Sequence, residues 1–362
     1  SYPIIREILA DPDNFRQDYE RREQLRSGPA VVEQPYYQAL RRMFFMMDGA
    51  DHARLRPLFA KWFMGPTRTR DLIPRVEASA KRALDDLEGV ERFDLIRDFA
   101  HLIPLRVICE IMGVPDEEAL RIAHDLEEIV PIIETVHKTP EVKARADKAM
   151  VRLQDYFDSL IAERRRNLGD DLLSAMIRAS EEGAFRDEAE LHANILLMYL
   201  AGHETTTSVI GLSLLTLFRN PDVLDQLRRS NEITSAMVEE LLRYDNTSQG
   251  VSRATQRDVT LGGKHIEKGS FILCLLAAAN RDPSVFPDPD RLILDRDCKN
   301  TLSFGYGAHF CIGNMLARAE VRIALSQLLA RRPNLQLETA DPPSSWFKPS
   351  LTRALLKLPA HG

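Results

Sequence analysis

The chain has 362 residues, a length that suits one large domain or two of ordinary size. Hydrophobic residues make up 44% of it and charged residues 28%, the balance of a soluble globular protein. Its formal net charge of -6 gives no bulk electrostatic reason to expect nucleic-acid binding.

The cysteines and the apolar runs indicate the cellular compartment. No close spacing links the four cysteines, which argues against a disulfide framework and fits a reducing cytosol. They are Cys109, Cys274, Cys298 and Cys311. No basic-then-apolar leader opens the chain, and the longest apolar run, 195–202, is too short to span a bilayer. We therefore expect a cytoplasmic protein without a membrane anchor.

The first 60 residues predict a helix, a loop and a second helix. Residues 1–26 predict a helix with apolar side chains at helical spacing that is broken at 11–13 and polar after the break, and the mixed period of 27–47 predicts a partly ordered loop. Asp51 is a candidate N-cap for the next helix, in which His52 and Arg56 share one face. Two cations on one face repel unless an anion lies before them, and the alternative is a solvated basic face.

The middle of the chain predicts helix after helix from about 70 to 190. The sequence from Met112 to Pro115 ends one of these helices, and a charged stretch, 120–155, is interrupted at Pro131 and Pro140. No internal repeat or low-complexity linker marks a boundary. We therefore predict a single domain over 1–362.

Residues 191–218 predict a long buried helix with a polar centre at 202–208. A buried glutamate in such a helix is costly unless it is hydrogen-bonded or functional. The alternative is an exposed turn at 202–208 between two short helices. Beyond it, Glu240 and Arg243 form an i,i+3 pair, 246–253 predicts a strand and 259–266 a β-hairpin.

The segment 304–313 surrounds Cys311 with three glycines, and a helical pattern follows at once. A helix N-terminus stabilises a thiolate, so we expect a lowered thiol pKa. The alternatives are a buried structural thiol and a zinc site shared with His309. Zinc prefers paired ligands, and this segment offers no second pair.

This segment closely resembles the haem-binding signature of the cytochromes P-450, the haem-thiolate monooxygenases, of the soluble bacterial type. The resemblance covers almost the whole chain. It implies a mainly α fold with a small β part, in which haem lies between a long central helix and the cysteine loop. The family has another helix and two strands before the segment that opens this chain, so we expect 1–362 to lack that N-terminal part.

The resemblance also implies a cofactor and its ligands. Haem b is the expected cofactor, with the sulfur of Cys311 as its axial iron ligand. The residues expected to bind or surround the haem are His52, Arg56, Ala201, Arg253, Phe304, Gly305, His309 and Gly313. Among them, the two histidines and two arginines are expected to meet the propionates.

Oxygen activation is expected at residues 201–206. By the resemblance, Thr205 steadies the distal oxygen, Glu204 relays protons and Gly202 leaves room for dioxygen, whereas His203 receives no role. Glu240 and Arg243 are expected to join Arg291 in a buried network that supports the cysteine loop.

The expected reaction is hydroxylation or epoxidation of a hydrophobic small organic molecule. The apolar residues expected near it are Phe44, Phe45, Leu200, Val251 and Leu351, and residues 347–357 resemble a terminal hairpin that reaches the substrate. Electrons are expected from a ferredoxin or flavodoxin with its reductase, docked on a basic patch. The patch residues are Arg54, Lys61, Arg318 and Arg322, for which ordinary surface charge is the alternative.

Two other functions remain open from the sequence. One is a haem-thiolate enzyme that runs on peroxide or catalyses a non-oxygenating rearrangement. The other is a non-catalytic haem carrier or sensor.

Overall fold

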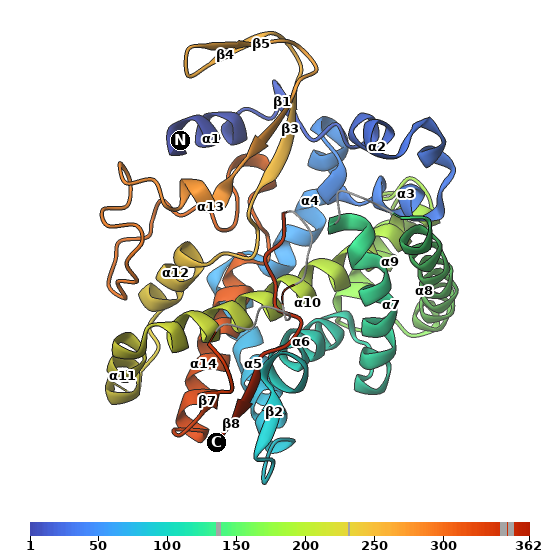
Figure 1. The fold of residues 1–362 in the computed structure, drawn as a ribbon. Coiled ribbons are helices and arrows are strands. Elements are labelled where there is room, and N and C mark those ends of the chain that lie inside the picture. The colour runs from blue at the N-terminus through green and yellow to red at the C-terminus, as the bar shows by residue number, and fades with distance from the viewer. Residues whose placement is uncertain (135–138, 231, 341–345, 347–350) are drawn as a thin grey trace.

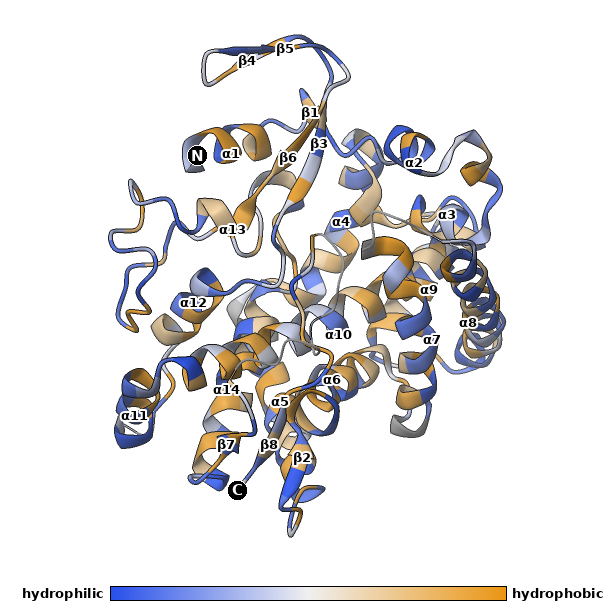
Figure 2. Ribbon diagram, in the orientation of Figure 1, coloured by the Kyte–Doolittle hydropathy of each residue, from blue (hydrophilic) through white to orange (hydrophobic). Residues whose placement is uncertain are grey.

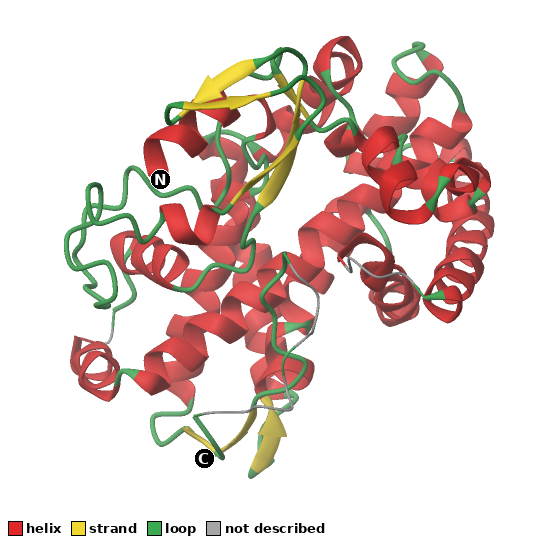
Figure 3. Ribbon diagram, turned by 45° about the horizontal axis from the view of Figure 1, so that its top comes forward, coloured by secondary structure: helices red, strands yellow, loops and turns green. Residues whose placement is uncertain are grey.

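The computed structural model describes residues 1–134, 139–230, 232–340, 346 and 351–362. Helices dominate these residues, and three small sheets complete the fold, which confirms the predicted mainly α class with a small β part. The strands lie at two extremes of the molecule with the helices between them (Figure 3). Among the helices of the described ranges, none combines the length and apolar character that a bilayer crossing requires.

The helices follow one another with short connections. In the first part of the chain they are α1 Tyr2–Ala10, α2 Tyr19–Ser27, η1 Pro29–Glu33, α3 Pro35–Leu40, η2 Phe44–Met46, α4 Gly49–Phe63, α5 Pro66–Asp85, η3 Leu95–Ala100, α6 Leu102–Met112, α7 Asp116–Glu134 and α8 Pro140–Arg166. In the second part they are α9 Leu172–Glu181, α10 Glu188–Arg219, α11 Pro221–Ser230, α12 Ser235–Tyr244, α13 Leu276–Ala279, η4 Gly307–His309 and α14 Asn314–Arg331.

The strands pair antiparallel in three small sheets. One has the order β1 (Phe15–Arg16), β3 (Val251–Thr255) and β6 (Phe271–Cys274). A second has the order β2 (Arg92–Asp94), β8 (Pro359–His361) and β7 (Gln336–Leu337), and β4 (Val259–Leu261) with β5 (Lys264–Ile266) forms the third. The predicted hairpin at 259–266 is therefore confirmed.

Helix α10 runs through the centre of the molecule (Figure 1). Its side chains are buried almost all round, as its hydrophobic colouring indicates (Figure 2), whereas α8 carries a hydrophilic outer face. The helix begins where the Asp187 carboxylate accepts a hydrogen bond from the Glu190 N–H at 2.7 Å. It continues without a break through residues 202–208, so the predicted long buried helix is confirmed and the alternative of an exposed turn is wrong.

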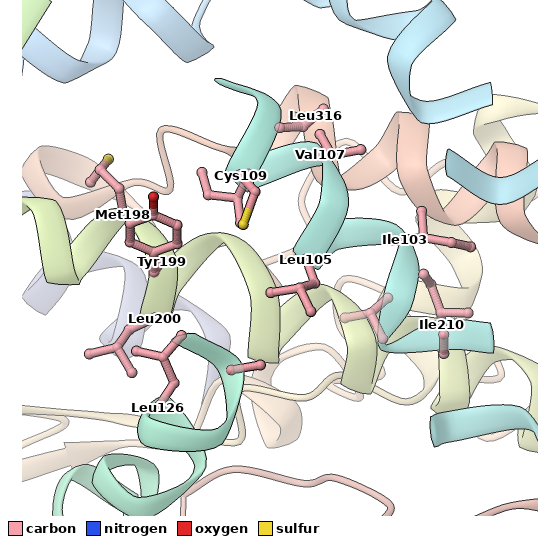
Figure 4. Packing of buried hydrophobic residues seen from close by; sticks show 14 of the residues in the cluster. Ile103, Leu105, Val107, Cys109, Leu126, Met198, Tyr199, Leu200, Ile210 and Leu316 are labelled. Carbon is pink, nitrogen blue, oxygen red and sulfur yellow. The ribbon is translucent and has the colours of Figure 1, made fainter. Parts of the chain in front are cut away.

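The core around α10 joins segments that are far apart in sequence. Figure 4 shows Ile103 and Cys109 of α6, Tyr199 of α10 and Leu126 of α7 together in it. All four side chains are 0% exposed. Burial of a large apolar side chain stabilises the fold by on the order of 1.5–3 kcal/mol. This packing holds α10 between α6 and its other neighbours.

Two details near the N-terminus differ from expectation. Residues 27–47 are not a partly ordered loop, because η1, α3 and η2 occupy most of that range. Helix α4 begins after Asp48, so Asp51 lies in its first turn and is not the N-cap. The Asp48 carboxylate instead accepts hydrogen bonds from the backbone N–H groups of Gln17 and Asp18.

A buried ion pair anchors the chain that leads to the cysteine loop. Arg243 meets the Glu240 carboxylate with two hydrogen bonds of 2.6 and 2.9 Å, and both side chains are 0% exposed. The remaining Arg243 donors reach the carbonyls of Asn280 and Pro289 at 2.9 Å. The third member of this network is Arg296, whose Nε donates to Glu240 at 3.1 Å.

The prediction that the Arg291 side chain joins this network is therefore wrong. The Arg291 side chain is exposed, and the residue takes part only through its carbonyl, which accepts from Arg243 at 3.3 Å. Sequence spacing does not show which of two nearby arginines turns inward, because the segment from 280 to 300 is irregular.

We predict that Glu240→Gln lowers the free energy of unfolding by about 3–5 kcal/mol, because it leaves the buried charge of Arg243 uncompensated. Urea unfolding followed by circular dichroism measures the change. Lys81→Gln, which breaks an exposed pair with Asp85, is the control and should leave the midpoint unchanged. Equal effects of the two substitutions would contradict this account.

Candidate functional site

The cysteine loop, residues 304–313, is a tight turn held by its own backbone. The Cys311 N–H donates to the Phe304 carbonyl at 3.0 Å, and the Asn314 side chain donates to the Cys311 carbonyl at 2.7 Å. Gly305 and Gly307 have φ of 74° and 73°, where other residues are strained. A Cβ at Gly307 would lie 2.1 Å from the Leu9 carbonyl oxygen, so α1 packs directly on this loop.

The loop is also attached to the scaffold behind it. Ser303 donates to the Leu242 carbonyl at 2.9 Å, and Asn280 accepts from the Leu302 N–H at 2.7 Å. The guanidinium of Arg318 lies 4.3 Å from the ring centroid of Phe304. The buried network around Arg243 therefore reaches the cysteine loop through Asn280.

The thiol of Cys311 is half-buried, in the loop that precedes α14. Burial raises its pKa, whereas the Gly313 N–H, Arg318 and Arg56 act in the opposite direction. The expected lowering by the helix N-terminus is therefore wrong for the protein alone, because desolvation of the charged form dominates.

The four side chains expected to meet an anion lie together, as a basic cluster of His52, Arg56, Arg253 and His309. The two imidazole centroids are 4.2 Å apart, and Arg56 donates to the carbonyl of Phe310, next to His309. Arg253 is near enough to His309 to lower the pKa of its imidazole, although burial is the main cause. Sequence positions about 250 residues apart thus come together in one cluster, in which the two arginines carry the positive charge.

Residues that the sequence reasoning missed orient this cluster. The Asp48 carboxylate lies 3.8 Å from His309 Nε2, and Gln17 approaches Nδ1 of the same ring at 3.4 Å. Arg22 bonds Ser252, the neighbour of Arg253, at 3.2 Å. An α-helical or strand pattern does not reveal such partners, because they come from segments that meet only after folding.

The polar centre of α10 presents a distinct face. Ala201 and Thr205 are exposed and one helical turn apart, whereas the residues that flank them along the helix are largely buried. The Thr205 hydroxyl donates to the Ala201 carbonyl at 3.0 Å. Burial raises the pKa of Glu204, whose side chain is 30% exposed.

Two further observations on α10 were not anticipated. A Cβ at Gly202 would lie 3.0 Å from Ile108, so this glycine permits close packing of α10 on α6. His203, given no role from the sequence, is fully buried and bonds His101 at 2.9 Å between Nε2 and Nδ1. The sequence signal was present, since a histidine amid apolar helical residues requires a partner.

The expected basic patch does not consist of four unpaired cations. Arg54 bonds the buried carboxylate of Glu190, and Arg318 pairs with Glu239. Two of the four patch residues are thus paired with carboxylates. Lys61 and Arg322 are the remaining candidates for contact with an electron donor.

Of the expected pocket residues, Phe44 stacks on Phe59 in the core at 4.8 Å. Phe45 is 44% exposed, Leu200 is buried, and Val251 and Leu351 are half-buried. In the predicted terminal hairpin 347–357, residues 347–350 lie outside the described residues.

The family model named Cytochrome P450 matches residues 7–357. This chain belongs to the cytochrome P450 family. Members of the family use haem b, and this P450 therefore does so as well.

Bacterial P450s are among its relatives. Cytochrome P450 107B1 of Saccharopolyspora erythraea is 37% identical and covers 99% of this chain and 87% of its own length. Vitamin D(3) 25-hydroxylase of Pseudonocardia autotrophica is 35% identical, with 99% and 86% covered.

Solved P450 structures share the fold. P450BioI, solved with a fatty-acyl carrier protein, superposes with a TM-score of 0.90 at 30% identity over 100% of this chain and 91% of its own. CYP267B1, solved with myristic acid, has a TM-score of 0.90 at 31% identity over 99% and 88%.

The residues present fit haem b. The basic cluster matches two propionates in sign, and Nε2 of His52 is buried with no hydrogen-bond partner among the described residues. A buried polar nitrogen without a partner is costly, so a carboxylate at this position would satisfy it. Cys311 supplies a soft sulfur donor of the kind that P450 haem iron takes.

Burial lowers the pKa of His101 and His203 to about 4. We therefore predict that these two histidines make the folded protein less stable in acid. Unfolded histidine titrates near 6.5, so between about pH 6.5 and 4 the unfolded chain binds more protons. The free energy of unfolding should therefore decrease as the pH is lowered through this range, by at most about 1.4 kcal/mol per pH unit for each histidine.

Urea unfolding at pH 7 and pH 5 measures this slope, and His101→Gln should reduce it. The carboxylates contribute equally to the pH dependence of the unaltered protein and of the variant, so their contribution cancels when the two slopes are compared. An identical pH dependence in the variant would contradict the prediction.

Proposed function

We propose that this P450 is a monooxygenase that activates dioxygen and inserts one oxygen atom into a hydrophobic small molecule. The observation that carries the proposal is the position of Cys311 in a rigid loop, beside a basic cluster that contains an unpartnered buried nitrogen. Haem, when bound, supplies the iron at which dioxygen is reduced and activated. The remaining steps concern this chain's own residues.

Cys311 is proposed as the residue that would hold the haem iron through its sulfur. The loop hydrogen bonds hold the sulfur in place, and the Gly313 N–H and the two arginines Arg56 and Arg318 favour its anionic form. Bound to the iron, the sulfur would be held as a thiolate, because a coordinating thiol is deprotonated. Phe304, Gly305 and Gly313 shape the loop around it.

The basic cluster is proposed to bind the propionates. Arg56 and Arg253 keep their charge at neutral pH, whereas burial lowers the pKa of His52 to about 4. His52 therefore acts as a neutral hydrogen-bond donor, and the arginines supply the charge that two carboxylates require. Ala201 lies one helical turn before Thr205, on the same side of α10.

Glu204 and Thr205 are proposed to manage protons on the oxygen-binding side. Because the pKa of Glu204 is raised, its carboxyl is better able to hold and release a proton near neutral pH. The Thr205 hydroxyl donates to the Ala201 carbonyl here and can instead donate to an oxygen atom of the substrate complex. An acid and a hydroxyl at adjacent positions are suited to proton delivery.

The substrate class and the electron donor are inferred from relatives and composition. One relative is named for vitamin D(3) hydroxylation, and one similar structure contains myristic acid, both apolar molecules. We propose a hydrophobic organic substrate and a ferredoxin or flavodoxin with its reductase as the electron source. A ligand screen that follows the haem Soret band identifies the substrate type.

The two alternatives are distinguished by simple measurements. Incorporation of oxygen-18 from dioxygen into product excludes a peroxide-only or rearranging enzyme. Multiple turnover with a reductase system excludes a haem carrier or sensor.

We predict that Cys311→Ala loses the haem-thiolate absorption of the reduced, carbon-monoxide-bound protein. The cause is loss of the sulfur donor, and the reading is an optical difference spectrum. Cys109→Ala, which changes a buried core thiol, is the control and should keep the haem-thiolate spectrum. A wild-type spectrum like that of a histidine-ligated globin would refute the assignment.

We predict that Glu204→Gln lowers product formed per electron pair consumed, and lowers the rate of product formation by about 100-fold, the lower range for general acid catalysis. Thr205→Ala should act in the same direction. Product and reduced-nicotinamide consumption are measured together. Full coupling in both variants would remove these two residues from the reaction.

A further inference from the structure

A line of proton-carrying atoms leads away from Glu204 into the protein. Nε2 of His203 bonds Nδ1 of His101 at 2.9 Å, and Nδ1 of His203, which has no hydrogen-bond partner among the described residues, lies 3.4 Å from Oε1 of Glu204. The His203 side chain is 0% exposed, whereas His101 is half-buried at the junction of η3 and α6. The line therefore runs from a water-accessible residue to the centre of α10.

Both imidazoles are suited to passing a proton. Burial lowers the pKa of each to about 4, so both are neutral at physiological pH. A neutral imidazole has one N–H and one acceptor nitrogen, so it can accept a proton on one side and release another on the opposite side. The ring planes are nearly perpendicular, at 76°, with the two nitrogens aligned for one hydrogen bond.

We propose that His101 and His203 form a proton-entry route to Glu204 through the interface between α6 and α10. The proposal rests on the proposed function, because Glu204 is the group that the route supplies. His101 accepts a proton from water at Nε2 and releases its Nδ1 proton to Nε2 of His203. A small rotation of the Glu204 side chain brings its carboxylate into hydrogen-bond reach of Nδ1 of His203, which then releases its proton to that carboxylate. Rotation of the rings restores the starting tautomers.

Only N–H and O–H bonds form and break in this sequence, and no electrons are transferred. The two histidines act through Glu204 and do not touch the substrate, so they are relay residues. Their route matters most when substrate covers the other side of Glu204. The Glu204 side chain is 30% exposed, and a hydrophobic molecule there removes the water that reaches it directly.

Other titratable groups face the same carboxylate. Glu127 of α7 is close enough to Glu204 that the two charges repel, which adds to burial in raising the pKa of Glu127. His124, one turn earlier on α7, acts on Glu127 in the opposite sense. Entry of protons through Glu127 is therefore the competing route, and the experiment separates it.

The test measures how fast the Glu204 carboxyl exchanges its proton for deuterium, without turnover. The haem-loaded protein is mixed with D2O at mildly acidic pH, and the carbonyl band of protonated Glu204 is followed by infrared spectroscopy. Glu204→Gln identifies that band. The measurement is made with and without 1-phenylimidazole, which fills the substrate side and carries no N–H of its own.

With 1-phenylimidazole bound, we expect exchange at least tenfold slower in His203→Phe than in the unaltered protein, and little difference without it. His192→Phe, another largely buried histidine of α10, is the matched control and should exchange normally. If His203→Phe does not bind haem, His101→Gln tests the same route at a half-buried position. Equal exchange in the ligand-bound proteins overturns the proposal, as does slow exchange in Glu127→Gln alone.

A second measurement uses turnover. His203→Phe should lower the product formed per electron pair and increase the solvent deuterium isotope effect at saturating substrate, whereas His192→Phe should change neither. If Glu204→Gln keeps full coupling, the proposed role of Glu204 fails while the exchange result still stands. The two failures are therefore distinguishable.

Discussion

The buried pair of Glu240 and Arg243 is the constraint on which the support of the cysteine loop depends in this P450. Charges that are 0% exposed are tolerated only when every donor and acceptor is satisfied, and here the carbonyls of the 280–291 segment complete the set. That requirement fixes an irregular stretch of chain that has little regular hydrogen bonding of its own. Asn280 then passes the constraint to the residues before Cys311.

The two sides of the proposed haem site are built by different physical interactions. On the cysteine side, a loop with positive φ angles and close backbone contacts leaves the sulfur in one position. On the side that is proposed to bind oxygen, helix α10 carries a polar segment through the hydrophobic core, and the hydroxyls of this segment bond carbonyls one turn earlier. Packing of α6 against Gly202 keeps that segment helical despite its polar content.

Buried ionisable groups are concentrated around α10. Burial raises the pKa of Glu320 to about 8 and raises that of Glu204, and it lowers the pKa of His101 and His203 to about 4. All four groups are thereby shifted toward their neutral forms, because a low-dielectric interior disfavours charge. A neutral set of donors and acceptors can move protons without placing an isolated charge in the core.

The sequence by itself determined the family, the mainly α class, the long central helix and the hairpin at 259–266, because these depend on local spacing and glycine placement. It also named the four members of the basic cluster, although only by resemblance. Tertiary structure alone decided that Arg296 and not Arg291 turns inward, that Asp48 lies against His309, and that His203 meets His101. These contacts join segments separated by tens to hundreds of residues, and no local periodicity encodes which buried polar groups will meet.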